Sequence, residues 1–207
     1  KEAEQEVTKH RDELHIKSKH ISDSINYARL IQEAMLPSHE IFKENFQEHF
    51  IYYNPRDVVS GDFYWAEKYS NSIIYAVADC TGHGVPGAMV SMLGISLLNK
   101  ITTQNMNLKA SEILEQLRIE VKRMLKQTGG NHNARKDGMD IALCIIDTKT
   151  KQLQFSGAYN SLHIFRNNEI IVLKADRQPI GIYAKEKNFT NHEFQLQNND
   201  ILYSFSD

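Results

Sequence analysis

Residues 73–86 read IIYAVADCTGHGVP, and this stretch decides the fold. An apolar run with several β-branched residues ends at Asp79, a glycine-rich turn follows, and Pro86 then opens an apolar helical pattern. A carboxylate at the end of a strand, beside a glycine-rich turn, can present its oxygen atoms to a cleft. The stretch therefore predicts a strand, a turn carrying polar atoms and a helix, in that order.

Patterns on both sides of this stretch predict an α+β fold. Period-two patterns place strands at 50–53, 62–69, 73–78, 141–147, 153–158, 162–166, 170–173, 189–196 and 201–205. Helical patterns lie at 86–100 and 110–127, where Gly129 and Gly130 are expected to stop the second helix. Strands, then two helices, then many strands describe an α+β sandwich and not an alternating β–α–β sheet.

The first 37 residues form a separate helical segment. They contain no glycine, and their one proline is Pro37. A seven-residue interval relates Val7, Leu14, Ile21, Ala28 and Met35, whereas the second seam is mostly polar, so the pattern is half a coiled coil. We expect residues 1–37 to be a dimerising linker that continues upstream into a sensor domain absent from this chain, and residues 38–207 to be the domain it controls. A plain surface helix of the same domain is the alternative.

The composition argues against several classes of protein. The chain has 207 residues with 24 Lys+Arg against 26 Asp+Glu, a formal charge of −2, which is unsuited to a nucleic-acid surface. No unbroken apolar run approaches the ~18 residues of a membrane span, and the charged N-terminus is no signal peptide, so we expect no membrane contact by this segment. Two lone cysteines, Cys80 and Cys144, make no disulfide framework and indicate a cytoplasmic protein.

Three aspartates stand at strand ends: Asp62, Asp79 and Asp207. If the strands of Asp62 and Asp79 are antiparallel neighbours, both carboxylates share one end of the sheet. Carboxylates without a Cys or His cluster favour Mg²⁺ or Mn²⁺ over zinc. A single aspartate of this kind is more often a turn former or a helix cap, and a lone histidine such as His83 is more often structural. From the residues alone, a metal site and a structural role both stay open.

Two motifs make the chain resemble a known family. The segments SGDFYW at 60–65 and VADCTGHGVPGAM at 77–89 resemble the bacterial PPM-type (type-2C-like) serine/threonine phosphatases of the SpoIIE/RsbU branch. Further matches lie at 137–140, 157–160, 178–181 and 202–207. The resemblance covers residues 22–207, in the family's order, and the two glycine-flanked aspartate motifs together are specific to it.

The resemblance implies a PPM-phosphatase-like αββα sandwich, two antiparallel sheets flanked by helices, with two Mn²⁺ or Mg²⁺ ions at one end. The metal ligands that it implies are Asp62, Asp79, the backbone carbonyl of Cys80 and Asp207. A metal-activated water would then hydrolyse the phosphate ester without a phospho-enzyme. We further expect His83 to protonate the leaving oxygen and Arg56 to pair with the phosphate oxygens.

Relatives continue beyond the position of Asp207 into a glycine, a helix, a last strand and one more metal-binding aspartate. We therefore expect this domain to be C-terminally incomplete, with weak metal binding and little or no activity by residues 1–207 alone.

The resulting hypothesis is the metal-dependent serine/threonine phosphatase output domain of a bacterial signalling protein. The expected substrate is a phosphorylated partner-switching regulator of the anti-sigma-factor antagonist type, and a homodimer is expected through residues 1–36. One rival is a catalytically inactive pseudo-phosphatase that binds a phosphoprotein in a dimeric regulatory module. Another is a two-metal enzyme acting on nucleotides, such as a cyclase, but the sequence has neither a P-loop nor a suitably placed basic pair.

Overall fold

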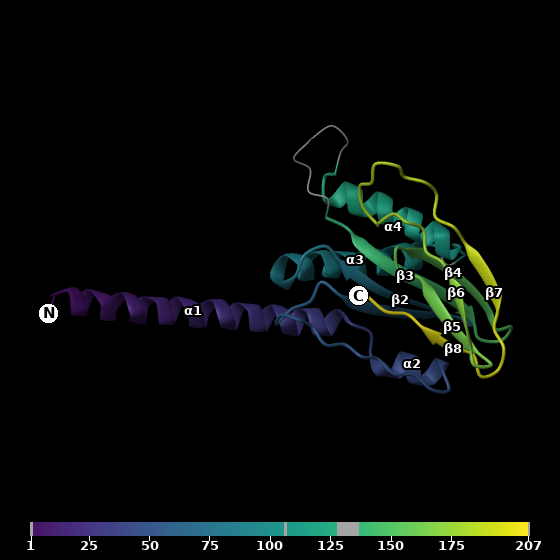
Figure 1. The fold of residues 1–207 in the computed structure, drawn as a ribbon, viewed down its shortest axis with the longest axis horizontal. Helices are drawn as coiled ribbons and strands as arrows, with labels where there is room; N and C mark the ends of the chain where they lie inside the picture. Colours follow the sequence, from purple (N-terminus) through teal and green to yellow (C-terminus); the bar gives the residue numbers. More distant parts are fainter. Residues whose placement is uncertain (1, 106, 128–136, 207) are drawn as a thin grey trace.

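The computed structural model describes residues 2–105, 107–127 and 137–206 (Figure 1). Its helices are α1 (Glu2–Met35), α2 (His39–Asn45), α3 (Gly84–Gln104) and α4 (Ala110–Met124). Its strands are β1 (Phe63–Tyr69), β2 (Ser72–Cys80), β3 (Met139–Asp147), β4 (Gln152–Ala158), β5 (Leu162–Arg166), β6 (Glu169–Leu173), β7 (His192–Gln195) and β8 (Ile201–Tyr203).

The strands of the described residues form two antiparallel sheets. The larger has the order β1-β2-β3-β4-β7 and the smaller the order β6-β5-β8. Helices α3 and α4 pack on one face of the larger sheet, and the smaller sheet packs on its other face (Figure 1). This arrangement confirms the predicted α+β fold with two antiparallel sheets and flanking helices.

Strand β2 is buried on both faces because it lies at the centre of these layers. Ile74 and Ala76 belong to the core beneath α3 and α4, whereas Ile73 and Tyr75 belong to the core between the two sheets. Side chains of successive strand residues point to opposite faces, so both faces of β2 must be apolar. This explains the unbroken apolar run before Asp79.

Helix α3 is long and apolar enough to cross a membrane, but it packs as a core helix of the domain. Ten of its 21 residues are buried, and it contacts α4, β1 and β2. The expectation from the sequence counted only unbroken apolar runs and therefore missed this helix, which has polar residues among its apolar ones.

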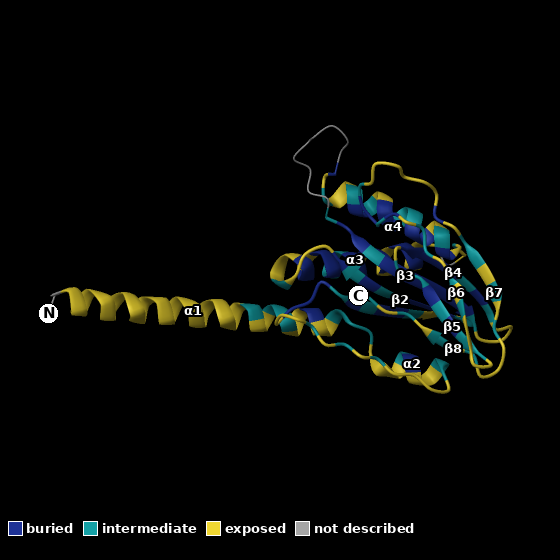
Figure 2. Ribbon diagram, viewed as in Figure 1, coloured by how far each residue is buried: buried dark blue, intermediate teal, exposed yellow. Residues whose placement is uncertain are grey.

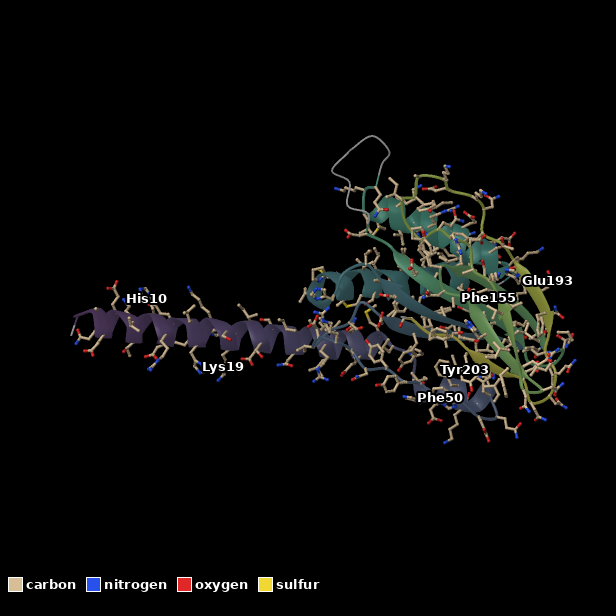
Figure 3. The ribbon with its side chains drawn as sticks, in the orientation of Figure 1. His10, Lys19, Phe50, Phe155, Glu193 and Tyr203 are labelled. Atoms are coloured by element: carbon tan, nitrogen blue, oxygen red, sulfur yellow. The ribbon has the colours of Figure 1, made fainter. Side chains whose placement is uncertain are left out.

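The predicted strand at 50–53 is wrong. The structure assigns no strand there: the Phe50 and Tyr52 side chains are mostly exposed, and the Tyr53 hydroxyl donates a hydrogen bond to the carbonyl of Asp62, 3.3 Å away. The Phe50 ring instead lies 6.4 Å from that of Tyr203, measured between centroids (Figure 3). Side-chain contacts hold this segment in place of a ladder of backbone hydrogen bonds.

Several predicted boundaries also shift. Helix α2 was not predicted, α4 ends at Met124 and not at 127, and the strand predicted at 189–196 shortens to β7. The glycines expected to stop α4 lie outside the described residues.

The helix predicted at the N-terminus is present and projects from the body of the molecule (Figure 1). It is exposed along most of its length, and burial begins only near its C-terminal end (Figure 2). Ile31, an apolar residue near this end of the helix, is nevertheless exposed. The one fully buried residue of the described part of α1 is Gln32, which is polar and leads to the site described next.

Candidate metal and phosphate site

Three aspartates lie in one row across neighbouring strands. Asp79 of β2 stands directly opposite Asp140 of β3. Phe63 of β1 stands opposite Ala78, so Asp62, one residue earlier, continues the same register toward Asp79. Residues opposite one another on antiparallel strands send their side chains to the same face, with Cβ atoms about 4.5–5.5 Å apart. The structure thus places Asp62 and Asp79 at one end of the sheet and brings Asp140 beside them.

The negative charge of this row affects the pKa of the neighbouring buried Cys80 thiol. Burial is the main cause that raises the pKa of the Cys80 thiol well above its usual range, and the negative charges of Asp79, Asp62 and Asp140 raise it further. All three carboxylates therefore lie within electrostatic reach of one residue. The site concentrates negative charge, which is the condition for attracting cations.

Glycines in the SGDFYW and VADCTGHGVPGAM motifs allow the backbone of one motif to contact the backbone of the other. A Cβ atom on Gly61 would lie 2.8 Å from the carbonyl oxygen of Gly82 and 3.0 Å from that of Cys80. A Cβ atom on Gly87 would overlap the same Gly82 carbonyl. Because the obstructing atoms are backbone, no side chain can move aside. The glycines therefore bring the Cys80 carbonyl next to the loop that carries Asp62.

The end of α1 holds that loop from the other side. The Gln32 side-chain oxygen accepts a hydrogen bond from the Ser60 backbone N–H at 3.0 Å. Its Nε2 donates to the Ser60 carbonyl at 2.6 Å and to Ser91 Oγ of α3 at 2.8 Å. The Ser60 hydroxyl in turn accepts from the Asp62 backbone N–H at 3.0 Å. Gln32 therefore joins α1 to both the Asp62 loop and α3.

Thr81 fixes the segment that leads into Asp140. Its backbone N–H donates to the Gly138 carbonyl at 2.9 Å, and its hydroxyl oxygen accepts from the Gly138 N–H at 2.5 Å. These bonds tie the turn after Asp79 to the start of β3. The positions of Asp79 and Asp140 are thus coupled by backbone contacts as well as by the sheet.

His83 and Arg56 are exposed, and they belong to the segments that follow Asp79 and precede Asp62 in the chain. His83 directly precedes α3, and its ring Nδ1 lies 3.0 Å from Oδ2 of Asp57. Arg56 is the exposed neighbour of Asp57 on the loop before Asp62. The structure therefore brings His83 to the loop that carries Arg56. Asp207 lies outside the described residues.

The donor atoms fit a hard cation. Among the residues that the structure describes, no three carboxylate, imidazole or thiol side chains converge closely enough to hold an ion by themselves. Asp62, Asp79 and the Cys80 carbonyl nevertheless supply the oxygen ligands that Mg²⁺ and Mn²⁺ prefer. Such ions keep several water ligands, so this donor set suits them better than zinc.

Sequence reasoning did not assign a role to Gln32, Asp57 or Asp140. The sequence could have indicated a role for Gln32, because it is a polar residue between the apolar residues Ile31 and Met35 near the end of the helix. Asp140 lay in a segment already matched to the family, but its place opposite Asp79 depends on pairing between residues about 60 positions apart. Asp57 gave no periodic or motif signal.

Comparisons with known proteins identify a matching family and similar folds. The family described as Stage II sporulation protein E (SpoIIE) matches residues 70–207. The SiaA-PP2C domain of Pseudomonas aeruginosa is 33% identical, covering 91% of this chain and 72% of that one, with a TM-score of 0.79. No curated protein sequence matches the chain significantly.

Two more distant structures share the fold. The PP2C phosphatase domain of SpoIIE from Bacillus subtilis, solved with a fragment of its regulatory domain, is 23% identical, with a TM-score of 0.56 over 70% of this chain and 40% of that one. The RsbU and RsbW domains of a Mycobacterium tuberculosis protein are 18% identical, with a TM-score of 0.54 over 71% of this chain and 38% of that one. At these identities the likeness shows the fold alone.

Proposed function

This chain belongs to the SpoIIE family of PP2C-type phosphatase domains, and on that premise we propose that it is a metal-dependent protein serine/threonine phosphatase. We assign it as the output domain of a bacterial signalling protein. Its proposed substrate is a phosphoserine or phosphothreonine on a partner-switching regulator of the anti-sigma-factor antagonist type. The observation that carries the proposal is the placement of Asp62 and Asp79 at one end of the sheet, beside the Cys80 carbonyl.

Asp62, Asp79 and the Cys80 carbonyl, together with Asp207, are the groups that we propose hold the ions. Two Mn²⁺ or Mg²⁺ ions bound there would lower the pKa of a water molecule and neutralise the phosphate dianion. Their oxygen donors and the concentrated negative charge support this assignment.

Two side chains of the exposed segments serve the substrate. The Arg56 guanidinium offers parallel N–H donors that match the oxygens of a phosphate group. The His83 imidazole can donate a proton from a ring nitrogen, which suits delivery of a proton to the departing serine or threonine oxygen. Arg56 precedes Asp62 by six residues and His83 follows Asp79 by four, so both belong to the segments that carry the proposed metal ligands.

The cysteines support a mechanism without a covalent intermediate. Both thiols are free and buried. Burial raises the pKa of the Cys144 thiol to about 12 and that of Cys80 well above its usual range. A nucleophilic cysteine needs the thiolate form, so neither residue suits that role at neutral pH. Free thiols also suit the cytoplasm, where we propose that the protein works.

We propose that residues 1–37 act as a switch helix between an upstream sensor and the domain at 38–207. The hydrogen bonds of Gln32 support this role, because a movement of α1 would move Ser60 and with it the Asp62 loop. The apolar seam of Val7, Leu14 and Ile21 is more than half exposed, which supports a homodimer through this helix.

A second candidate function is a pseudo-phosphatase that binds the phosphoprotein without hydrolysing it. One observation favours it: within the described ranges no three potential metal-binding side chains converge. The presence of both Asp62 and Asp79 favours the enzyme, since a binding module needs neither.

Phosphate release from a phosphorylated regulator of this type tests the proposal. The full chain should release phosphate with Mn²⁺ and lose this activity in a chelator, and Asp79→Asn should lose at least about a hundredfold. Asp147→Asn, at the far end of β3, is the matched control and should retain activity. Full release by Asp79→Asn would contradict the proposal, whereas stable binding without release would favour the pseudo-phosphatase.

A further inference from the structure

The ring of His83 is held by a carboxylate from a different segment. Asp57 Oδ2 lies 3.0 Å from Nδ1 of His83, although the two residues are 26 positions apart in the chain. A Cβ atom on the next residue, Gly84, would lie 3.5 Å from the same oxygen. The loop before Asp62 therefore crosses the first turn of α3, and its carboxylate meets both the histidine and the helix start.

This contact does not serve helix capping. His83 occupies the N-cap position of α3, with φ −122° and ψ 169°, yet its side chain makes no capping hydrogen bond. Asp57 instead bonds the ring. The carboxylate therefore holds the ring beside the start of α3 through a contact between two separate segments of the chain.

A hydrogen bond on one ring nitrogen also determines the role of the other. When Nδ1–H donates to Asp57, Nε2 is the nitrogen that remains to exchange a proton with another group. A carboxylate on Nδ1 fixes the orientation and tautomer of a catalytic histidine in the same way in other hydrolases. The His83 side chain is 70% exposed, and Nδ1 is the ring nitrogen that contacts Asp57, so the ring remains accessible to a substrate.

We propose that Asp57 is a positioning residue that holds His83 as the proton donor of the reaction; this inference rests on the proposed phosphatase function. In the step, a water oxygen bonds to phosphorus and the bond from phosphorus to the serine Oγ breaks, leaving its electron pair on Oγ. Oγ takes the proton from Nε2 of His83. The proton released by the attacking water returns through solvent to the imidazole, which regenerates the donor.

Leaving-group dependence separates this role from a structural one. The oxygen of phosphoserine needs a proton as it departs, whereas the phenolate of p-nitrophenyl phosphate departs without one. With Mn²⁺, Asp57→Asn in the full chain should lower kcat on a phosphoserine peptide by about ten- to a hundredfold, and kcat on p-nitrophenyl phosphate far less. His83→Ala should show the same selectivity, and the double variant should lose little more than His83→Ala alone.

Equal losses on both substrates, or no loss on either, would overturn the proposal. Asp147→Asn, at the end of β3 far from Asp140, is the matched control and should leave both rates unchanged. The urea midpoint of Asp57→Asn should match that of the parent chain, since an exposed side-chain contact of this kind contributes little to stability.

Nitrogen NMR of the His83 ring supplies a readout that does not depend on activity. The parent chain should show Nδ1 protonated as the dominant neutral form, and Asp57→Ala should show a mixture of both tautomers. If the parent releases phosphate from neither substrate, the proposed function fails while this spectrum still decides whether Asp57 holds the ring. A tautomer mixture already present in the parent would contradict the inference.

Discussion

The turn at residues 79–87 and the projecting part of α1 are constrained in opposite ways. In the turn, Gly87 has no room for a Cβ atom because the Gly82 carbonyl occupies that space. On α1, the seam residues Val7 and Leu14 are more than half exposed. In the turn, close packing against the backbone of the same chain explains why residue 87 is a glycine. The seam shows an apolar pattern that packing within the described chain does not explain, which is why we assign it to a second copy.

The largest effect on stability is expected from Gly87→Ala, which tests whether the turn at residues 79–87 is tightly packed. The added methyl group overlaps backbone atoms, so the turn must move, and the free energy of unfolding should fall by about 3 kcal/mol. Urea unfolding measures this loss. Ser96→Ala, on the exposed face of the same helix, is the control and should change stability by less than about 0.5 kcal/mol. An unchanged Gly87→Ala would show that the turn is not tightly packed.

Gln32→Ala should have the next largest effect, because Gln32 lies where the two regions meet. Its loss leaves the buried N–H of Ser60 without its partner and removes one of the two donors to the Ser60 carbonyl, so stability should fall by about 1–3 kcal/mol. Mn²⁺ affinity should fall as well, since the Asp62 loop loses a support. The exposed Gln5→Ala on the same helix is the matched control. Equal stability and equal Mn²⁺ affinity of the two variants would contradict the proposed link between α1 and the site.

Asp140→Asn should have a smaller effect, confined to ion binding. This change removes one charge from the row opposite Asp79 while preserving the size of the side chain. Because neighbouring carboxylates that do not themselves bind a metal typically change its affinity 10–100-fold, we expect Mn²⁺ affinity to fall by about tenfold. Calorimetric titration measures the change. A loss as large as that of Asp79→Asn would make Asp140 a direct ligand, and no loss would remove it from the site.

The smallest effect on the fold is expected from Leu14→Glu on the exposed seam. Because Leu14 lies on the projecting part of α1, the change should leave the stability of the body intact while charge repulsion separates the two copies. Sedimentation should therefore show a shift from dimer to monomer. His15→Glu, off the seam, should remain dimeric. A parent chain that is monomeric at micromolar concentration would contradict the dimer proposal.

The sequence predicted the strands whose pattern follows from burial and missed contacts set by pairing between distant segments. The apolar run of β2 could be predicted because both of its faces are buried. The segment at 50–53 misled because its aromatic residues resemble a strand, although the structure assigns no strand there. Aromatic residues are common in strands, but they also pack through their rings alone, as the contact between Phe50 and Tyr203 shows.

The site was predictable only in part for the same reason. Asp62 and Asp79 could be paired because their two strands are consecutive in the chain, with a tight turn between them. Asp140 could not, because β3 follows two helices and its register with β2 is fixed only in three dimensions. Gln32 and Asp57 act through hydrogen bonds to residues 28 and 26 positions away, and periodicity carries no information about such bonds.

The most direct test of the account is a Mn²⁺ titration of the full chain, of Asp79→Asn and of Asp147→Asn, followed by calorimetry. The account predicts saturable binding by the parent, equal binding by Asp147→Asn, and affinity at least about a hundredfold weaker for Asp79→Asn. Equal Mn²⁺ affinity of the parent and Asp79→Asn would contradict the claim that this end of the sheet is the metal site.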